Sequence, residues 1–157
     1  MSITIRPVGY VRGGRTEPID DNWGDVEATI ELDALQFDPD VTAGLADFSH
    51  LDVVYSFHLV SDEKIETKAR HPRGREDWPL VGIFAQRAKG RPNRIGVTTG
   101  EIVSVDGLRV HVRGLDAIDG TPVLDLKPYM VEFGPRGDVR EPDWARELMA
   151  EYWSTNP

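Results

Sequence analysis

Four basic side chains gather in the segment from residue 84 to residue 96, FAQRAKGRPNRIG, which contains no acidic residue. They are Arg87, Lys89, Arg91 and Arg94. Pro92 fixes one backbone torsion, and Gly90 and Gly96 permit close approach, so the segment has a defined shape. Arginine binds carboxylates and phosphates through paired hydrogen bonds. The segment therefore indicates a site for an anionic group, with a solvated basic loop as the alternative.

Three aspartates lie close together in the segment 113–129, RGLDAIDGTPVLDLKPY. Carboxylates at this density could bind a divalent cation. The spacing matches no calcium loop, however, and Asp119 before Gly120 is a natural turn former. We therefore expect no metal site. A carboxylate paired with a base or placed beside a cationic ligand is the favoured interpretation. A metal-dependent hydrolase that uses Asp116, Asp119 and Asp125 is the competing one.

Composition excludes several classes of protein. The 157-residue chain has no cysteine, which excludes disulfides, thiolate metal ligands and a cysteine nucleophile. A net charge of −9 argues against non-specific nucleic-acid binding, so a polyanion must meet a local basic surface. No glycine-rich nucleotide loop follows a strand, which excludes a Rossmann site. We expect a cytoplasmic protein without a membrane partner, since no membrane-length apolar run and no secretory signal are visible.

The elements that must position these residues are mostly strands. Alternating or apolar runs predict strands at 3–12, 26–32, 51–60, 80–86 and 122–127. The segment 100–116 predicts a hairpin with a two-residue turn at Asp106-Gly107. Six or seven short strands without regular intervening helices favour a mainly β fold, either an antiparallel barrel or a sandwich.

Helical patterns are few. Asp40 is suited to begin a short helical turn near 41–48. A better candidate is 142–153, where Pro142 and Asp143 suit a helix start. We expect a barrel domain over 1–135 and a C-terminal helical extension over 136–157, which packs on the barrel or on a partner subunit.

Four motifs carry a family resemblance. In chain order they are VGYVR (8–12), LADFSHLDVVYSFHL (45–59), GIFAQRAKGRPNRIG (82–96) and GLDAIDGTPVLDLKPY (114–129). Over residues 5–131 the chain resembles the TsaA-like, or TrmO, family. Bacterial members methylate threonylcarbamoyladenosine beside the anticodon of certain tRNAs, with S-adenosylmethionine as donor. The resemblance implies a small, predominantly antiparallel β-barrel that forms a homodimer, and a methyltransferase for tRNA or another nucleoside-containing substrate.

The resemblance also implies site residues. Cofactor contacts transfer to His58, Leu59, Arg87, Val97, Arg113, Gly114, Leu115 and Asp116. Arg87 is suited to the methionine carboxylate, and Asp116 to the ribose or the methionine ammonium. Residues suited to an anionic acceptor such as RNA phosphate are Arg73, Arg91, Asn93 and Arg94. Methyl transfer mainly requires alignment of donor and acceptor, and no catalytic residue can be named.

The chain departs from the family pattern at several points. Bacterial members have a Pro-Arg-Gln stretch that touches the cofactor, whereas this chain has EPIDDNWGD at 17–25. That contact is lost or passes to Pro18, Asp20, Asn22 or Trp23. FATR becomes FAQR, RPNPIG becomes RPNRIG, and the bacterial enzymes carry an additional C-terminal domain. The alternative function is therefore an S-adenosylmethionine-binding protein that acts on another substrate or serves a regulatory role.

Overall fold

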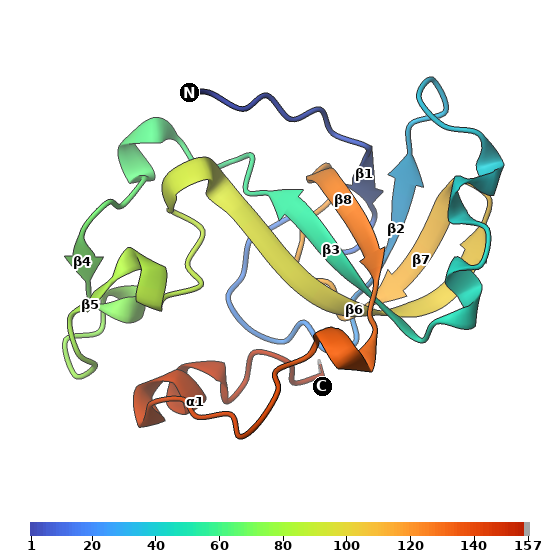
Figure 1. Ribbon diagram of the computed structural model, residues 1–157. Coiled ribbons are helices and arrows are strands. Elements are labelled where there is room, and N and C mark those ends of the chain that lie inside the picture. Colours follow the sequence, from blue (N-terminus) through green and yellow to red (C-terminus); the bar gives the residue numbers. More distant parts are fainter. Residues whose placement is uncertain (156–157) are drawn as a thin grey trace.

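A computed structural model describes residues 1–155, and six of its strands close into an antiparallel barrel (Figure 1). The barrel strands are β1 (Gly9–Arg12), β2 (Glu27–Leu32), β3 (His50–Ser56), β6 (Ile95–Asp106), β7 (Arg109–Arg113) and β8 (Pro122–Pro128). Their order is β1-β2-β7-β6-β3-β8, and pairing of β8 with β1 closes the sheet. The prediction of a mainly β fold with a small antiparallel barrel is confirmed.

The barrel core follows from the alternation of side chains along each strand. Inward positions are apolar and fully or nearly fully buried, namely Val11, Ala28, Ile30, Leu51, Val53, Tyr55, Val110, Val112 and Val123. The intervening positions, such as Glu27 and Arg109, face outward and are exposed. Closure lets one continuous core form from six short strands and leaves no unpaired sheet edge.

Three predicted strands are shorter than expected. Ladder pairing begins only at Gly9, so the strand expected over 3–12 is confined to its last four residues. The strand expected over 51–60 ends at Ser56, because the chain turns back there and the His58 amide donates to the Ser56 carbonyl. The strand expected over 80–86 reduces to β5 (Val81–Gly82), since a 3-10 turn follows it at Ile83–Ala85.

The β6–β7 hairpin turns one residue later than expected. Asp106 pairs with Arg109, so the two-residue turn is Gly107-Leu108. Gly107 has a φ of 56°. Glycine with positive φ at the first central position is typical of a type II′ turn, which matches the twist of the flanking strands.

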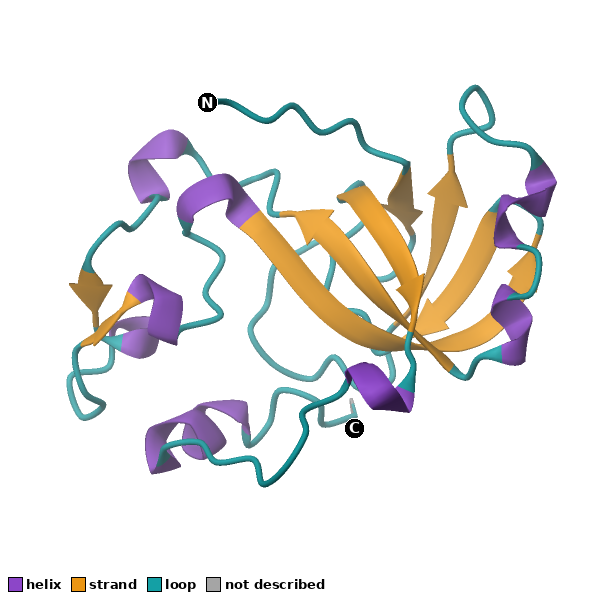
Figure 2. Ribbon diagram, viewed as in Figure 1, coloured by secondary structure: helices purple, strands orange, loops and turns teal. Residues whose placement is uncertain are grey.

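A small lobe lies beside the barrel (Figure 2). Within residues 57–94, strand β4 (Ala69–Arg70) pairs with β5. The side-chain amide of Gln86 fastens this pair by donating to the carbonyl oxygens of Arg70 and Val81. Short 3-10 turns make up much of the rest of this lobe, at Asp62–Lys64, Pro72–Gly74, Ile83–Ala85 and Pro92–Arg94.

The helical predictions hold only in part. Helix α1 spans Asp143–Met149, with Pro142 as its N-cap residue, and is therefore shorter than the range 142–153. The turn expected near 41–48 is two 3-10 turns, Pro39–Thr42 and Leu45–Asp47. A further 3-10 turn at Val131–Phe133 precedes α1. None of the helices among the described residues is long and apolar enough to span a bilayer.

The C-terminal segment, residues 136–155, lies against both the lobe and the barrel. Trp78 of the lobe donates its indole N–H to the Glu147 carboxylate on α1, at 2.8 Å. Further along, the amide of Trp23 donates to the carbonyl oxygen of Tyr152, also at 2.8 Å. The Tyr152 ring packs against a small buried cluster of Trp23, Val26 and Ile118. The last two residues, 156 and 157, lie outside the described part of the chain.

Candidate functional site

Three loops meet at one end of the barrel, residues 13–26, 57–94 and 114–121. They meet because β1, β3 and β7 end here, while β2, β6 and β8 begin here. Most of the predicted cofactor-binding residues belong to these loops or to the start of β6. They are His58, Leu59, Arg87, Val97, Gly114, Leu115 and Asp116.

The Asp116 carboxylate is the centre of this end of the barrel. Its Oδ1 accepts hydrogen bonds from the Tyr55 hydroxyl on β3, at 2.9 Å, and from the Thr98 hydroxyl on β6. Its Oδ2 accepts a hydrogen bond from the hydroxyl of Tyr152 in the C-terminal segment. Three neutral donors from three separate parts of the chain thus hold one half-buried carboxylate in place.

Tyr55 reaches Asp116 because its ring lies across Gly96, its partner residue on β6. A Cβ atom at Gly96 would lie 2.6 Å from two carbons of this ring. Real Cβ atoms do not approach that closely, so the glycine is required wherever the ring occupies this position. This packing gives the glycine of the RPNRIG motif a specific role in the site.

The two tyrosines that contact Asp116 are donors over the physiological pH range. Burial, followed by the charge of Asp116, raises the pKa of Tyr55 well above its ordinary value. The same two causes, in the same order, raise the pKa of Tyr152. Neither phenol therefore supplies a base to the site near neutral pH.

Arg87 lies close to this cluster. Its Nη2 atom donates to the carbonyl oxygen of Val97, at 2.5 Å, one residue before Thr98. Its positive charge also acts to lower the pKa of Tyr55, although burial outweighs that effect. Because a guanidinium has five N–H donors, an exposed Arg87 retains donors for a ligand.

Apolar side chains are exposed in the loop 57–94 and at the start of β6. Leu59 is 66% exposed and Val97 is 43% exposed, so both can contact a ligand directly. His58 is also exposed, and its Nε2 lies 4.0 Å from the position of a Cβ at Gly120. Leu115 differs from these residues, because its side chain is 1% exposed and belongs to the barrel core. Only its backbone is available at the site.

Arg113 points away from this cluster. It is the last residue of β7 and occupies an outward position. Its guanidinium pairs with Glu27 at 2.6 Å and with Glu101 at 3.2 Å, across neighbouring strands. The Gly114 amide that follows it donates to the carbonyl oxygen of Val26, at 2.9 Å. The structure therefore brings Gly114 and Asp116 to the site without the Arg113 side chain.

The arginines predicted to contact an anionic acceptor already have partners within the chain. Arg91 donates to the carbonyl oxygens of Gln86 and Ala88, which shapes its own loop. Arg94 pairs with Asp62. Asn93, between them in the 3-10 turn, is exposed with a φ of 64°. The acids missing from the basic segment are therefore partly supplied from elsewhere in the sequence.

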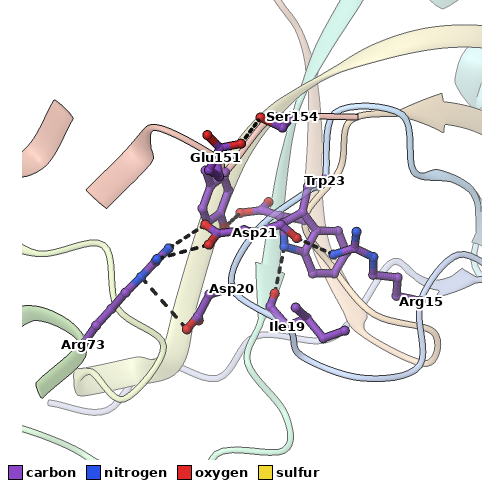
Figure 3. A network of polar contacts seen from close by, with 10 residues as sticks. Arg15, Ile19, Asp20, Asp21, Trp23, Arg73, Glu151 and Ser154 are labelled. Atoms are coloured by element: carbon purple, nitrogen blue, oxygen red, sulfur yellow. Dashed lines mark hydrogen bonds and ion pairs between the residues drawn. The ribbon is translucent and has the colours of Figure 1, made fainter. Parts of the chain in front are cut away.

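Arg73 lies opposite the loop 13–26, as Figure 3 shows. Its guanidinium is 3.0 Å from the Asp21 carboxylate and 4.0 Å from that of Asp20. This contact connects the lobe to the loop 13–26.

That loop is held together from within. Arg15 donates to the carbonyl oxygens of Asp21 and Asn22, and its guanidinium lies 4.5 Å from the Trp23 ring centre (Figure 3). The Trp23 indole donates to the carbonyl oxygen of Ile19, at 2.9 Å, and only 2% of this residue is exposed. The tryptophan is thus a structural anchor of the loop.

The three clustered aspartates do not converge. Asp119 accepts a hydrogen bond from the amide of Gly13, and Asp125 pairs with Lys127. Asp116 takes the three hydroxyls described above. Within residues 1–155 no group of three or more acidic or histidine side chains is placed to hold a metal ion.

Three residues of the Asp116 cluster were missed at the level of sequence. Tyr55 lies within the predicted strand 51–60 and Tyr152 within the predicted helix 142–153, and no pattern singles out Thr98. Periodicity identifies which face a residue occupies, but it does not identify the partner of a hydroxyl. The position of Tyr55 opposite a glycine becomes visible only once the β3–β6 register is known.

The fold is a closed antiparallel barrel, and most of the residues predicted to bind a cofactor lie in or beside the loops at one end. Residues 16–134 match the family model described as the tRNA-methyltransferase O N-terminal domain. The chain belongs to this family, which confirms the resemblance read from the motifs.

Individual relatives differ in how much they share with the chain. A Pyrococcus abyssi protein, named "Probable S-adenosyl-L-methionine-binding protein", is 35% identical over 148 residues, which cover 89% of this chain and 75% of that protein. A human tRNA (adenine(37)-N6)-methyltransferase is 37% identical over 99 residues, 63% of this chain but 22% of the human one. The crystal structure of TrmO from Pseudomonas aeruginosa matches with a TM-score of 0.71 and 28% identity, over 89% of this chain and 62% of that chain.

Proposed function

We propose that this protein is an S-adenosylmethionine-dependent methyltransferase, and that its acceptor is the N6 nitrogen of threonylcarbamoyladenosine in tRNA. The observation that carries the proposal is that Arg87 and Asp116 form hydrogen bonds with adjacent residues of β6, Val97 and Thr98, at one end of the barrel. Family membership and the names of the human and Pyrococcus relatives support the same activity.

The residues at this end fit the chemistry of S-adenosylmethionine. We propose that the free N–H donors of Arg87 bind the methionine carboxylate. The Asp116 carboxylate would accept from the ammonium or a ribose hydroxyl, and exposed Leu59 and Val97 would cover apolar parts of the molecule. Arg113 and Leu115 would contribute through their backbone, because their side chains are engaged elsewhere. His58 and Gly114 complete the proposed set.

Bound S-adenosylmethionine supplies an electrophilic methyl group. Transfer of that methyl to the acceptor nitrogen would leave the C–S electron pair on the thioether sulfur, and the nitrogen would lose its proton to water. The contribution of the chain is to orient and hold the reactants. Asp116 is fixed by three hydroxyl groups, and Tyr55 and Tyr152 keep their protons. The site therefore acts by alignment, with no phenol serving as base.

We propose that Arg73, Asn93 and Arg94 bind phosphates of the acceptor RNA. Arg91 would hold the basic segment 84–96 in shape through its hydrogen bonds to the carbonyl oxygens of Gln86 and Ala88. Arg73 and Arg94 would exchange their present carboxylate partners for phosphate.

We also propose a cytoplasmic homodimer, which would cover exposed apolar side chains near the site such as Phe84, 81% exposed. The proposed domain division is a barrel domain at 1–135 and an extension at 136–157.

Titration calorimetry with S-adenosylmethionine tests the cofactor assignment. Arg87→Ala should weaken binding about tenfold or more, because a charge-assisted pair to the carboxylate is lost. Arg109→Ala is the matched control, since Arg109 lies on the barrel exterior at the β6–β7 hairpin, 3.9 Å from Glu31. Absence of binding by the unaltered protein would contradict the proposal.

The tRNA assignment has its own test. Mass spectrometry of tRNA from a strain lacking the gene should show loss of the methylated threonylcarbamoyladenosine, with recovery when the gene is restored. An unchanged content would remove tRNA as the substrate.

A second candidate function is S-adenosylmethionine binding for another substrate or for regulation. It is favoured by the net charge of −9 and by the pairing of Arg73 and Arg94 with carboxylates. Cofactor binding by the purified protein, together with unchanged tRNA in the deletion strain, would select this candidate.

A further inference from the structure

Tyr152 contacts the site from outside the family domain. The family match ends at residue 134, whereas Tyr152 lies in the C-terminal segment beyond α1. Its hydroxyl nevertheless donates to Oδ2 of Asp116, thirty-six positions earlier in the chain. Neither the family motifs nor the helix pattern of the sequence assigns this residue a function.

The hydrogen bonds of Asp116 leave room for one more donor. A carboxylate offers about four acceptor positions. Tyr55 and Thr98 occupy Oδ1, and Tyr152 occupies one position on Oδ2. The remaining position belongs to the oxygen that Tyr152 holds. The orientation of that oxygen therefore depends on a residue of the C-terminal segment.

The position of Tyr152 is itself enforced by packing and backbone contacts. Its ring packs against the cluster of Trp23, Val26 and Ile118. Backbone hydrogen bonds join residues 22–24 to residues 151–154, among them one of 2.8 Å from the Trp23 amide to the Tyr152 carbonyl oxygen. A Cβ at Gly24 would overlap the carbonyl oxygen of Trp153, so the two segments lie in direct backbone contact.

We propose that Tyr152 is a positioning residue of the cofactor site, whose hydroxyl orients Asp116 to accept a hydrogen bond from the ammonium or a ribose hydroxyl of an S-adenosyl ligand. The inference rests on the proposed function of the site. It makes the C-terminal segment part of that site, although the segment lies outside the family domain. Tyr152 acts through Asp116 and needs no contact with the ligand.

The test uses Tyr152→Phe, which keeps the ring and removes only the hydroxyl. Titration calorimetry with S-adenosylhomocysteine should show binding weakened roughly fivefold, less than the loss of a direct hydrogen bond to a charged group, because Tyr152 acts on the ligand only through Asp116. Tyr10→Phe is the matched control, because Tyr10 is exposed on β1. Thermal unfolding of both variants establishes that each is folded at the temperature of the titration.

A double-mutant cycle separates positioning from a general structural role. In the Asp116→Asn background, Tyr152→Phe should have almost no further effect on affinity, since there is no carboxylate left to orient. Equal effects of Tyr152→Phe in both backgrounds, or no effect on the unaltered protein, would overturn this inference and leave the cofactor site standing. Failure of the unaltered protein to bind either S-adenosyl compound would overturn the proposed function and this inference together.

Discussion

The guanidinium of Arg87 donates a hydrogen bond to the carbonyl oxygen of Val97, and the next residue, Thr98, donates to Asp116. A single step along β6 therefore joins a cation from the lobe to an anion from the loop 114–121. A zwitterionic amino-acid group requires both charges within reach of one another. The start of β6 brings the two charges to adjacent residues of one strand, Val97 and Thr98.

Arg113→Ala should leave the affinity for S-adenosylmethionine within about twofold of that of the unaltered protein, because the Arg113 side chain points away from the site. The exposed ion pairs that the variant loses contribute little to the stability of the fold. The guanidinium of Arg113 pairs with Glu27 and Glu101 on the barrel exterior. Titration calorimetry alongside Arg87→Ala checks the contrast. Comparable losses in both variants would show that the Arg113 side chain reaches the ligand.

Gly96→Ala should destabilise the fold by about 1–3 kcal/mol, the usual cost of an overpacked core. The added Cβ would meet the Tyr55 ring at 2.6 Å and Phe57 at 2.9 Å. Urea denaturation measures the change in the free energy of unfolding. Gly82→Ala is the control, since a Cβ there meets no atom within 4 Å. Equal stability of the two variants would be inconsistent with the position of the ring.

Leu51→Ala should lower the free energy of unfolding by about 2–5 kcal/mol, because it opens a cavity in the barrel core. Leu51 is 0% exposed, whereas Leu35, the control position, is 93% exposed. Leu35→Ala should change the stability by less than about 0.5 kcal/mol. Denaturation curves of the two variants under the same conditions test whether the barrel interior is the main core.

Stability should fall as the pH rises through and above about 10. Burial and the charge of Asp116 raise the pKa of Tyr55 and of Tyr152 in the folded protein. The folded state therefore keeps protons that the unfolded chain releases, so the stabilisation is complete below the ordinary tyrosine pKa and is lost above it. Urea denaturation between about pH 8 and pH 11 measures the slope.

The double variant Tyr55→Phe/Tyr152→Phe tests the origin of this pH dependence. The single variant Tyr10→Phe is its control. The double variant should show a shallower loss of stability with rising pH, because its two buried phenols are gone. Tyr10→Phe should retain the slope of the unaltered protein. A slope that is the same in all three proteins would contradict the assignment.

Local pattern was enough to predict the strands and a mainly β fold, and the family resemblance selected the barrel over the sandwich. Alternation along β2 and β7 predicts that Ala28 and Ile30 share one face, as do Val110 and Val112, and all four are buried. The motifs of the basic segment and of 114–129 were enough to identify the family. These features are determined by neighbours in sequence, because strand periodicity and turn chemistry are local properties.

Partners of charged and hydroxyl groups were not determined locally. The sequence placed Arg94 in a segment without acids, yet Asp62 pairs with it, and it placed Arg113 beside Asp116, yet their side chains diverge. The strand ends at Arg113, so its side chain follows the outward alternation, while the chain beyond turns across the barrel end.

The sequence by itself determined a small antiparallel barrel, its inward-facing residues and its family. Only the tertiary structure decided that Tyr55, Thr98 and Tyr152 converge on Asp116. The physical reason is that barrel closure sets the β3–β6 register, and docking of the C-terminal segment on residues 22–24 brings in Tyr152. Both depend on contacts between segments far apart in the chain, which no local pattern of residues encodes.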